Sequence, residues 1–354
     1  MYKIFVINVG STSTKVAYYV DRECKLKSNL EHDAQELLNF GDVLFQRDYR
    51  KKKILDYMEQ NGIKLEELDA ITSRGGHTRP IEGGVYRINE LMLAEIKTGK
   101  FGRHACDLGP GIAYELVKGI KALALVVDPP VTDEYENIAR YSGSPLMPRQ
   151  SRFHALNHKA TAKRYARDNG LDYHNLNLIS VHMGGGISVA AHRKGRIIDA
   201  TNGIDGEGPF STNRTGGLTA KYLADLCFSG IYTQDQIHKL INGGGGLVAY
   251  LNETDVRKCE EKAAHDPYTS EVLDAMMYQI AKEVGAYSAV LKGKIDAVLL
   301  TGGISYSKYL MTKLTDSISY LGKIVIYPGE NEMEALAFGA YDVLAKEEQI
   351  KSLE

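Results

Sequence analysis

Short runs of β-branched and apolar residues alternate along the chain with longer segments whose apolar residues recur every three or four positions. This alternation is typical of mixed α/β proteins. The strand-like runs predict strands at residues 3–9, 15–20, 68–73, 123–128, 177–182, 187–192, 196–200, 295–301 and 323–327. The helical spacing predicts main helices, each burying one face, in GPGIAYELVKGI, LTAKYLADLCF, SEVLDAMMYQIAKEVGAYSAVL and MEALAFGAYDVLAK.

The chain contains two similar segments separated by 174 residues, VINVGSTSTKVA at residues 6–17 and SVHMGGGISVAA at residues 180–191. Each has an apolar strand, a polar residue (Asn8 or His182), a turn of small residues and a second apolar strand. Such a pattern predicts a β-hairpin whose turn leaves backbone N–H groups free to bind an anion. Glycine-rich hairpins occur in many α/β proteins, but the matched polar position favours two related domains that bind a polyphosphate across a cleft.

The segment YSGSPLMPRQSRF at residues 141–153 concentrates glycine, serine and proline and predicts an irregular connection. We therefore expect a domain boundary there, between residues 1–150 and residues 151–334. The length of 354 residues, 44% of them hydrophobic and 25% charged, is sufficient for two domains of ordinary size.

Charge and cysteine content exclude several function classes. A net charge of -2 and a pI near 6.6 give no reason to expect nucleic acid or an anionic membrane as partner. The four cysteines are scattered without a CxxC pair, so we expect them to be reduced. No apolar run reaches membrane-spanning length, and the first residues lack a signal-peptide pattern. These features predict a cytoplasmic protein.

The first turn carries alternating polar residues, Asn8, Ser11, Ser13 and Lys15. On an extended segment several of them would share one face, where an amide, hydroxyls and an ammonium suit phosphate oxygens. The alternative is that the serines only satisfy the turn and that Lys15 is a solvated surface charge.

Two arginines and one aspartate lie at the ends of predicted strands or in glycine-rich loops, which are common positions for functional groups. Arg74 lies between a strand and the loop GGHTRPIEGG, and Arg214 lies in GEGPFSTNRTGG. A guanidinium binds a carboxylate or a phosphate through two hydrogen bonds. Asp128 closes the strand LALVV before two prolines, which is where open α/β sheets keep their sites, although it could also simply start a turn.

Two histidines are further candidates. His182 directly precedes the GGG turn and corresponds to Asn8, whereas His158 lies in FHALNHKA, and a lone histidine is usually structural. Near the end of the chain, the glycines of VLLTGGIS would let the backbone approach adenine closely. The acidic residues Glu330, Glu332 and Glu334 suit either the water shell of Mg2+ or the start of a helix.

Taken in order, VINVGSTSTK, ITSRGGHTRP, VVDPPVTDEY, RFHALNHKA, VHMGGGISVAAHRKGRIIDATNG, STNRTGG and VLLTGGIS resemble the acetate and butyrate kinase family, and its butyrate kinase branch most closely. The resemblance covers nearly the whole chain. It implies the actin, hexokinase and heat-shock-protein-70 superfamily, in which duplicated actin-like (ribonuclease H-like) α/β domains close over a nucleotide. It also implies that the last helix, about residues 335–354, rejoins the first domain.

The resemblance implies an ATP-dependent kinase that converts butyrate to butyryl phosphate, reversibly, with ATP or ADP and Mg2+ as cofactors and a short-chain carboxylate or acyl phosphate as partner. It also implies a homodimer or a higher homo-oligomer. Carried over by position, the catalytic residues would be Arg74, Asp128, His158, His182, Arg214 and Asn8. The nucleotide-binding residues would be Ser11, Ser13, Lys15, Gly184, Gly185, Gly186, Thr301, Gly302, Gly303 and Ile304, and the metal-binding residues Glu332, preferred over Glu334, and Asn8.

The chain departs from acetate kinases in its shorter length, its SRGGHTRPIEGG segment and its DPP run, and these departures favour butyrate over acetate. Acetate and branched-chain acids remain alternative substrates. A sugar or polyol kinase of the same superfamily would need Asp128 as a base, and the two arginines argue against it. A non-catalytic nucleotide switch of the actin kind is the remaining alternative.

Overall fold

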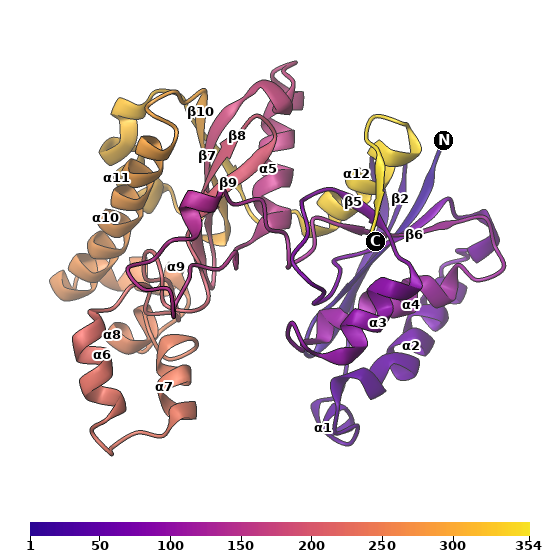
Figure 1. The fold of residues 1–354 in the computed structure, drawn as a ribbon, viewed down its shortest axis with the longest axis horizontal. Helices are drawn as coiled ribbons and strands as arrows, with labels where there is room; N and C mark the ends of the chain where they lie inside the picture. Colours follow the sequence, from indigo (N-terminus) through magenta and orange to yellow (C-terminus); the bar gives the residue numbers. More distant parts are fainter. The chain divides into compact units, whose positions relative to one another are not determined.

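The computed structural model describes residues 1–354, which form two compact units. Unit 1 comprises Met1–Asp133 and Asn331–Glu354, and unit 2 comprises Glu134–Glu330. The indigo start and the yellow end of the chain in Figure 1 therefore belong to the same unit. The C-terminal segment returns to unit 1.

The division at residues 133/134 lies earlier in the chain than the expected boundary at 150/151. The intervening residues belong with unit 2 because their polar groups bond to its strand at residues 196–200. The Tyr135 hydroxyl donates to the Ala200 carbonyl at 2.6 Å, and Arg149 Nη1 donates to Asp199 Oδ1 at 2.9 Å. Glycine, serine and proline content marked an irregular segment correctly, but not the unit with which it packs.

Unit 1 is built on a seven-stranded mixed sheet with the order β12-β5-β6-β4-β1-β2-β3. Its strands are β1 (Lys3–Val9), β2 (Ser13–Val20), β3 (Glu23–Glu31), β4 (Ala70–Ser73), β5 (Val85–Arg87), β6 (Leu123–Val127) and β12 (Ile350–Ser352). Strands β1, β2 and β3 form an antiparallel meander, and β4 and β6 extend the sheet from β1 as parallel strands.

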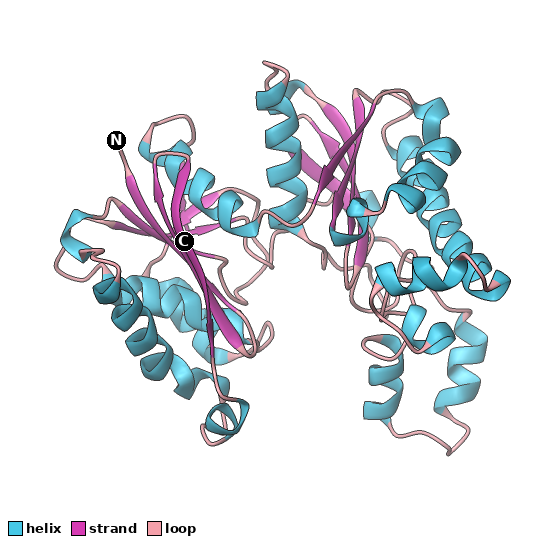
Figure 2. Ribbon diagram, turned by 180° about the vertical axis from the view of Figure 1, so that it is seen from behind, coloured by secondary structure: helices cyan, strands magenta, loops and turns pink.

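Helices cover both faces of this sheet (Figure 2). They are α1 (Ala34–Leu38), α2 (Arg47–Gln60), α3 (Glu90–Thr98), α4 (Leu108–Leu116) and α12 (Glu332–Leu344), with 3₁₀ helices η1 (Val43–Gln46), η2 (Leu65–Glu67) and η3 (Ala105–Asp107). Phe5 and Ile7 of β1 pack in one core with Ile112 of α4. Gly339 of α12 lies directly against Val127 of β6, so this helix approaches the sheet closely.

Unit 2 is built on a five-stranded sheet with the order β11-β10-β7-β8-β9. Its strands are β7 (Asn177–Met183), β8 (Ile187–Arg193), β9 (Arg196–Ala200), β10 (Ala297–Gly302) and β11 (Ile324–Pro328). The order β9-β8-β7-β10-β11 repeats β3-β2-β1-β4-β6 of unit 1, including every parallel and antiparallel pairing. The internal repeat in the sequence therefore reflects a duplicated actin-like α/β domain, and the predicted fold class is confirmed.

The sheet of unit 2 also has helices on both faces, and other helices of this unit lie away from the sheet. The helices of unit 2 are α5 (Ala155–Asp168), α6 (Ala220–Cys227), α7 (Gln234–Ile241), α8 (Leu247–Leu251), α9 (Val256–Ala263), α10 (Pro267–Val290) and α11 (Lys308–Ile318), with 3₁₀ helices η4 (Asn137–Arg140), η5 (Tyr173–Asn175), η6 (Gly303–Tyr306) and η7 (Ser319–Leu321). Tyr165 of α5 packs with Leu178 and Leu299 on one face, while Ile280 of α10 packs with Val181 and Leu300 on the other.

The prediction that LTAKYLADLCF buries one helical face is wrong. The segment forms α6, but none of its residues is buried, and Tyr222 remains 70% exposed. Apolar spacing shows that a helix has an apolar face, not that a second element lies against that face. In Figure 1, α6 and α7 extend away from the sheet of unit 2.

No helix of the structure combines the length and the apolar character required to cross a bilayer.

Candidate functional site

Three predicted site residues of unit 1 lie at the ends of neighbouring strands, on the same side of the sheet. β1, β4 and β6 are adjacent and parallel, with Ile7 beside Ser73 and Ser73 beside Val126. Asn8, Arg74 and Asp128 lie at the carboxyl ends of these strands. Parallel strands thus bring together side chains that are far apart in the sequence, at the position where α/β sheets bind ligands.

Glu332, the first residue of α12, links two of these residues. Its Oε2 accepts a hydrogen bond from Asn8 Nδ2 at 2.8 Å, and its Oε1 lies 3.2 Å from Arg74 Nη1. Burial, followed by Cys24 and then the charge of Glu334, raises the pKa of Tyr19, and Glu330, in unit 2, lies 3.3 Å from Nε2 of His182. Glu332 thus contacts both Asn8 and Arg74.

Asp128 occupies a strained backbone position. Its φ of 38° lies in the left-handed region, which costs free energy for a residue with a side chain. The residue is 3% exposed; its Oδ1 accepts from the Gly84 N–H at 2.7 Å, and its own N–H donates to the Gly84 carbonyl at 2.9 Å. These bonds fix the direction in which the chain leaves β6.

The first turn differs in detail from the expected alternation. Asn8 pairs with Lys15 across the β1–β2 hairpin, so these two side chains share a face with Ser13. Ser11 lies in the turn itself and is exposed, as is Lys15. The amide, one hydroxyl and the ammonium are therefore grouped on the strands, and the second hydroxyl stands at the tip.

Arg50 of α2, which has no exposed surface, organises this turn. Its Nη1 donates to the carbonyls of Gly10 at 2.9 Å and Ser13 at 3.1 Å, and its Nη2 donates to the carbonyl of Ser11 at 2.8 Å. Burial lowers the pKa of Arg50 to about 10, so the side chain remains charged at neutral pH. Because a buried cation binds the turn carbonyls, their partial negative charge is neutralised, which favours an anion at this turn.

The same turn makes unit 1 sensitive to acid through His32, whose Nε2 lies 2.8 Å from Thr14 Oγ1. Burial first, and then the charges of Arg50 and Lys53, lower the pKa of His32 to about 4. The unfolded chain, with a pKa of about 6.5, takes up a proton that the folded chain resists, so stability is full above about pH 6.5 and falls as the pH drops toward about 4. We expect the free energy of unfolding to fall by up to about 1.4 kcal/mol per pH unit in this window because of His32.

Urea titrations of the wild type and His32→Asn over this pH window measure that contribution. The variant should lose the corresponding part of the pH slope, whereas His265→Asn, at an exposed histidine, should retain it. An identical slope in His32→Asn and the wild type would contradict the assignment.

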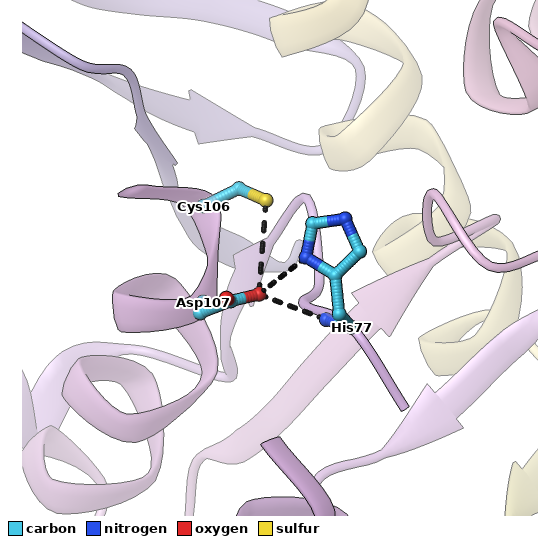
Figure 3. A group of neighbouring side chains, drawn as sticks. All are labelled: His77, Cys106 and Asp107. Carbon is cyan, nitrogen blue, oxygen red and sulfur yellow. Dashed lines mark hydrogen bonds and ion pairs between the residues drawn. The ribbon is translucent and has the colours of Figure 1, made fainter. Parts of the chain in front are cut away.

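The loop after Arg74 is clamped by Asp107 of η3. Asp107 Oδ1 accepts from the backbone N–H of His77 at 2.8 Å, lies 2.9 Å from His77 Nδ1 and 4.0 Å from Cys106 Sγ (Figure 3). These three residues carry ligand atoms that could together hold a metal ion such as Zn2+. However, the Asp107 oxygen is already bonded to His77, and burial raises the pKa of Cys106 to about 12, so it is a thiol. We interpret the cluster as a clamp that holds the Arg74 loop.

In unit 2, the second hairpin places His182 beside the glycine turn. His182 pairs with Ser188, and Met183 with Ile187, so the turn consists of Gly184–Gly186 and is one residue shorter than the first turn. His182 is 3% exposed, and its Nδ1 is buried without a hydrogen-bond partner. A buried polar atom without a partner at a glycine turn is consistent with a site for a polar ligand.

Arg214 packs against this turn. Its Nη1 donates to the Gly203 carbonyl, its Nε is buried without a partner, and burial lowers its pKa. A Cβ on Gly186 would overlap the guanidinium, so a residue with a side chain there would displace Arg214. Ser211 Oγ donates to the Gly185 carbonyl at 2.6 Å. The loop that carries Arg214 therefore packs against the glycine turn and holds the guanidinium beside the N–H groups of that turn.

The two histidines of FHALNHKA have different surroundings. His158 has no exposed surface, and its ring nitrogens bond to Ser180 at 2.5 Å and Ser188 at 2.8 Å. His154, at the N-terminus of α5, stacks on His182 with ring centroids 3.9 Å apart. His154 is thus the residue that lies beside His182, and His158 lies behind it in the core.

The predicted adenosine segment runs from the end of β10 into η6. Thr301 pairs with His182 in the sheet, and Gly302, with a φ of 96°, lies so close to the Met183 backbone that a side chain would overlap it. A Cβ on Gly303 would meet open space, and Ile304 is buried. This segment therefore lies beside the second glycine turn within unit 2.

Sequence reasoning missed Arg50, His104 and His154. The Nε2 of His104 lies 3.5 Å from the Ser11 hydroxyl, and burial, followed by the charge of Arg74, lowers the pKa of His104. The available signal for His154 was the spacing of four in HALNH, which puts both histidines on one side of a helix. No local signal marks Arg50, which lies in a basic run typical of a solvated helix face.

The duplicated sheets define a class of protein, the actin-like α/β proteins. Residues 137–348 match the family model described as the Acetokinase family, and because this is more than half of the chain, the chain belongs to the acetokinase family.

Solved structures agree on the fold. The acetate kinase of Porphyromonas gingivalis is 20% identical with a TM-score of 0.81, the match covering 97% of this chain and all of that one. A propionate kinase from Francisella tularensis subsp. tularensis is 18% identical with a TM-score of 0.76, covering 96% and 99%. An acetate kinase from Entamoeba histolytica is 14% identical with a TM-score of 0.76, covering 98% and 99%. At these identities the likeness shows the fold alone.

Proposed function

We propose that this chain transfers the γ-phosphoryl group of ATP to the carboxylate of butyrate, giving butyryl phosphate and ADP, and catalyses the reverse reaction. The observation that carries the proposal is the position of Arg214, whose guanidinium is held against the glycine turn Gly184–Gly186 beside His182. A turn of N–H groups combined with a planar cation suits a transferring phosphoryl group. Membership of the acetokinase family supports a carboxylate as acceptor.

The chemistry explains why arginines rather than a general base should dominate. A carboxylate is ionised at neutral pH and needs no deprotonation before it attacks. The obstacle is the approach of two anions, so catalysis consists of positioning and charge neutralisation. A sugar hydroxyl is neutral and would need a base instead of cations.

We assign Arg74 to the acyl carboxylate, Arg214 to the transferred phosphoryl group, and Asn8 and His182 to its equatorial oxygens. His154 joins this set because it stacks on His182. His158 is fully buried and both its ring nitrogens are bonded, so we assign it to the support of the site.

A single carboxylate fits the requirements of Mg2+, which binds through few protein oxygens and keeps most of its water. Glu332 is 20% exposed and each of its oxygens contacts a neutral or cationic donor, Asn8 or Arg74. We propose that Glu332, Asn8 and Asp128 hold the water shell of the ion. When bound, Mg2+ would neutralise the charge of the β- and γ-phosphates.

We propose butyrate rather than acetate because the sequence departs from the acetate kinase pattern at SRGGHTRPIEGG and DPP. Gly75 lies against Pro129, since a Cβ on it would come within 2.7 Å of the proline Cβ, and Gly76 lies against Asp107. The two departures from the acetate kinase pattern, SRGGHTRPIEGG and DPP, therefore pack on each other. We also propose that the protein is a homodimer or a higher homo-oligomer, as the resemblance implies.

Purified protein with ATP, Mg2+ and hydroxylamine tests the proposal, because hydroxylamine traps an acyl phosphate as a coloured hydroxamate. We expect trapping with butyrate, and the highest kcat/KM for butyrate in a panel from acetate to isovalerate. Where an acid becomes too long for the pocket, one additional methylene should lower kcat/KM by about 10-fold or more. The absence of hydroxamate with every acid would refute a carboxylate kinase, and a maximum at acetate would refute only the choice of substrate.

A further inference from the structure

The core of unit 2 contains an unbroken chain of alternating imidazole and hydroxyl groups. It connects His154, beside His182, with Tyr173, near the start of β7. Five hydrogen bonds of 2.8, 2.8, 2.5, 2.6 and 2.8 Å connect, in order, His154 Nδ1, Ser188 Oγ, His158, Ser180 Oγ, His192 and the Tyr173 hydroxyl. Apart from His154, all of these residues are buried.

The two serines make the chain directional. Ser180 and Ser188 have no exposed surface, and the partners of each hydroxyl are two histidine nitrogens. A hydroxyl has one hydrogen, and leaving it unpaired in the core is costly. Each serine therefore donates to one histidine and accepts from the other.

The internal histidines transmit that direction because they are neutral. Burial lowers the pKa of His158 well below its ordinary value and the pKa of His192 to about 3. A neutral imidazole has one N–H and one bare nitrogen, so it too donates once and accepts once. All hydrogen bonds between His154 and Tyr173 consequently point the same way.

Tyr173 determines the direction in which these hydrogen bonds point. A phenol is a stronger acid than an imidazole N–H, and an imidazole nitrogen is a better acceptor than a phenol oxygen. Tyr173 therefore donates to His192 Nδ1, and the sense of the chain runs from Tyr173 toward His154. At its end, Ser188 donates to His154 Nδ1, so the hydrogen of the neutral His154 ring resides on Nε2.

We propose that this chain of hydrogen bonds fixes His154 as the Nε2–H tautomer, so that His154 donates a hydrogen bond to an anionic phosphoryl oxygen without carrying a charge. The inference rests on the proposed function for the identity of the acceptor. Tyr173, His192, Ser180, His158 and Ser188 are then positioning residues that act through His154. This positioning role also accounts for the place of His158 in the core, where it would support the site without contacting a ligand.

The test reads the tautomer directly, by ¹⁵N NMR of protein labelled at histidine, without substrate. The His154 signals are assigned by their loss in His154→Gln. We expect Nε2–H in the wild type, and a shift toward a mixture of tautomers in Ser188→Ala and in Tyr173→Phe. Turnover should fall about 3- to 10-fold in Ser188→Ala, with a smaller loss in Tyr173→Phe, because one hydrogen bond to the phosphoryl group is partly lost.

Tyr165→Phe is the matched control, since Tyr165 is 3% exposed and lies in the same core cluster as Tyr173. It should leave both the tautomer and turnover unchanged, and Ser188→Thr, which retains the hydroxyl, should retain the tautomer. Nδ1–H in the wild type, or an unchanged tautomer in both chain variants, overturns the inference even if the protein makes butyryl phosphate. If the tautomer is as expected but no acid is phosphorylated, the proposed function fails, and the role given to the Nε2–H donor fails with it.

Discussion

Arg214→Ala is expected to lower turnover about 1000-fold while the protein remains folded. The guanidinium is held against the second glycine turn by its bond to the Gly203 carbonyl, and its Nε is buried without a partner. A half-buried cation with free donors is preorganised for charge that develops in the transition state, where it has its largest effect. Steady-state kinetics with ATP and butyrate should show the loss mainly in kcat, and Arg214→Lys should restore little of it because a lysine cannot form the bidentate contact.

A glycine variant tests the same contact without removing the arginine. A Cβ on Gly186 would overlap the Arg214 guanidinium and lie 3.1 Å from the Gly203 carbonyl, so Gly186→Ala should displace the cation and reduce turnover in the same way. Gly143→Ala, where a Cβ would meet open space, should have no effect, and neither should Arg257→Ala, whose side chain is 87% exposed. Near-normal turnover in Arg214→Ala would remove this residue from the mechanism.

The parts of the fold that were predictable from the sequence are those encoded in short stretches of it. The β1–β2 and β7–β8 hairpins show short apolar runs joined by small-residue turns within a dozen positions, so local patterns suffice to locate them. The edge strand β3, with the sequence ECKLKSNLE, was missed because it has no buried residue and therefore no apolar signal. The short strands β5 and β12 were missed for lack of length.

The site residues show where local reasoning ends. His154 and His158 are chemically identical in the sequence, but His158 lies in the core between the hydroxyls of Ser180 and Ser188, whereas His154 bonds to Ser188 and stacks on His182. Those serines come from two different strands, so no spacing within FHALNHKA could have separated the two roles. The position of a residue in a tertiary hydrogen-bond network is a long-range property.

The acidic residues at the start of α12 illustrate the same limit. The three glutamates of GENEME alternate along the sequence, and the helix periodicity alone does not decide which of them faces the sheet edge. The structure pairs Glu332 with Asn8 and Arg74 because the returning segment runs across the carboxyl ends of β1 and β4. That return is a property of the duplicated topology, in which the last helix of the chain completes the first unit.

Arg50→Met is expected to destabilise unit 1 by about 3–5 kcal/mol and to raise the KM for ATP about 10-fold. Methionine retains much of the volume of the side chain, so the loss measures the charge and its hydrogen bonds rather than a cavity. Removing the guanidinium leaves the carbonyls of Gly10, Ser11 and Ser13 without their cationic partner, and the turn is then free to rotate its N–H groups away from a bound phosphate. Urea unfolding gives the stability change, and kinetics at saturating butyrate give the KM.

Arg47→Met is the matched control, one turn earlier on the same helix. Its side chain is 47% exposed and its ion pairs with Asp48 and Glu115 are at the surface, where such pairs contribute little. We expect a change of less than about 1 kcal/mol there and an unchanged KM for ATP. If Arg50→Met lost stability but kept its KM, Arg50 would support the fold of unit 1 without shaping an anion site, and the first turn would lose its place in the proposed mechanism.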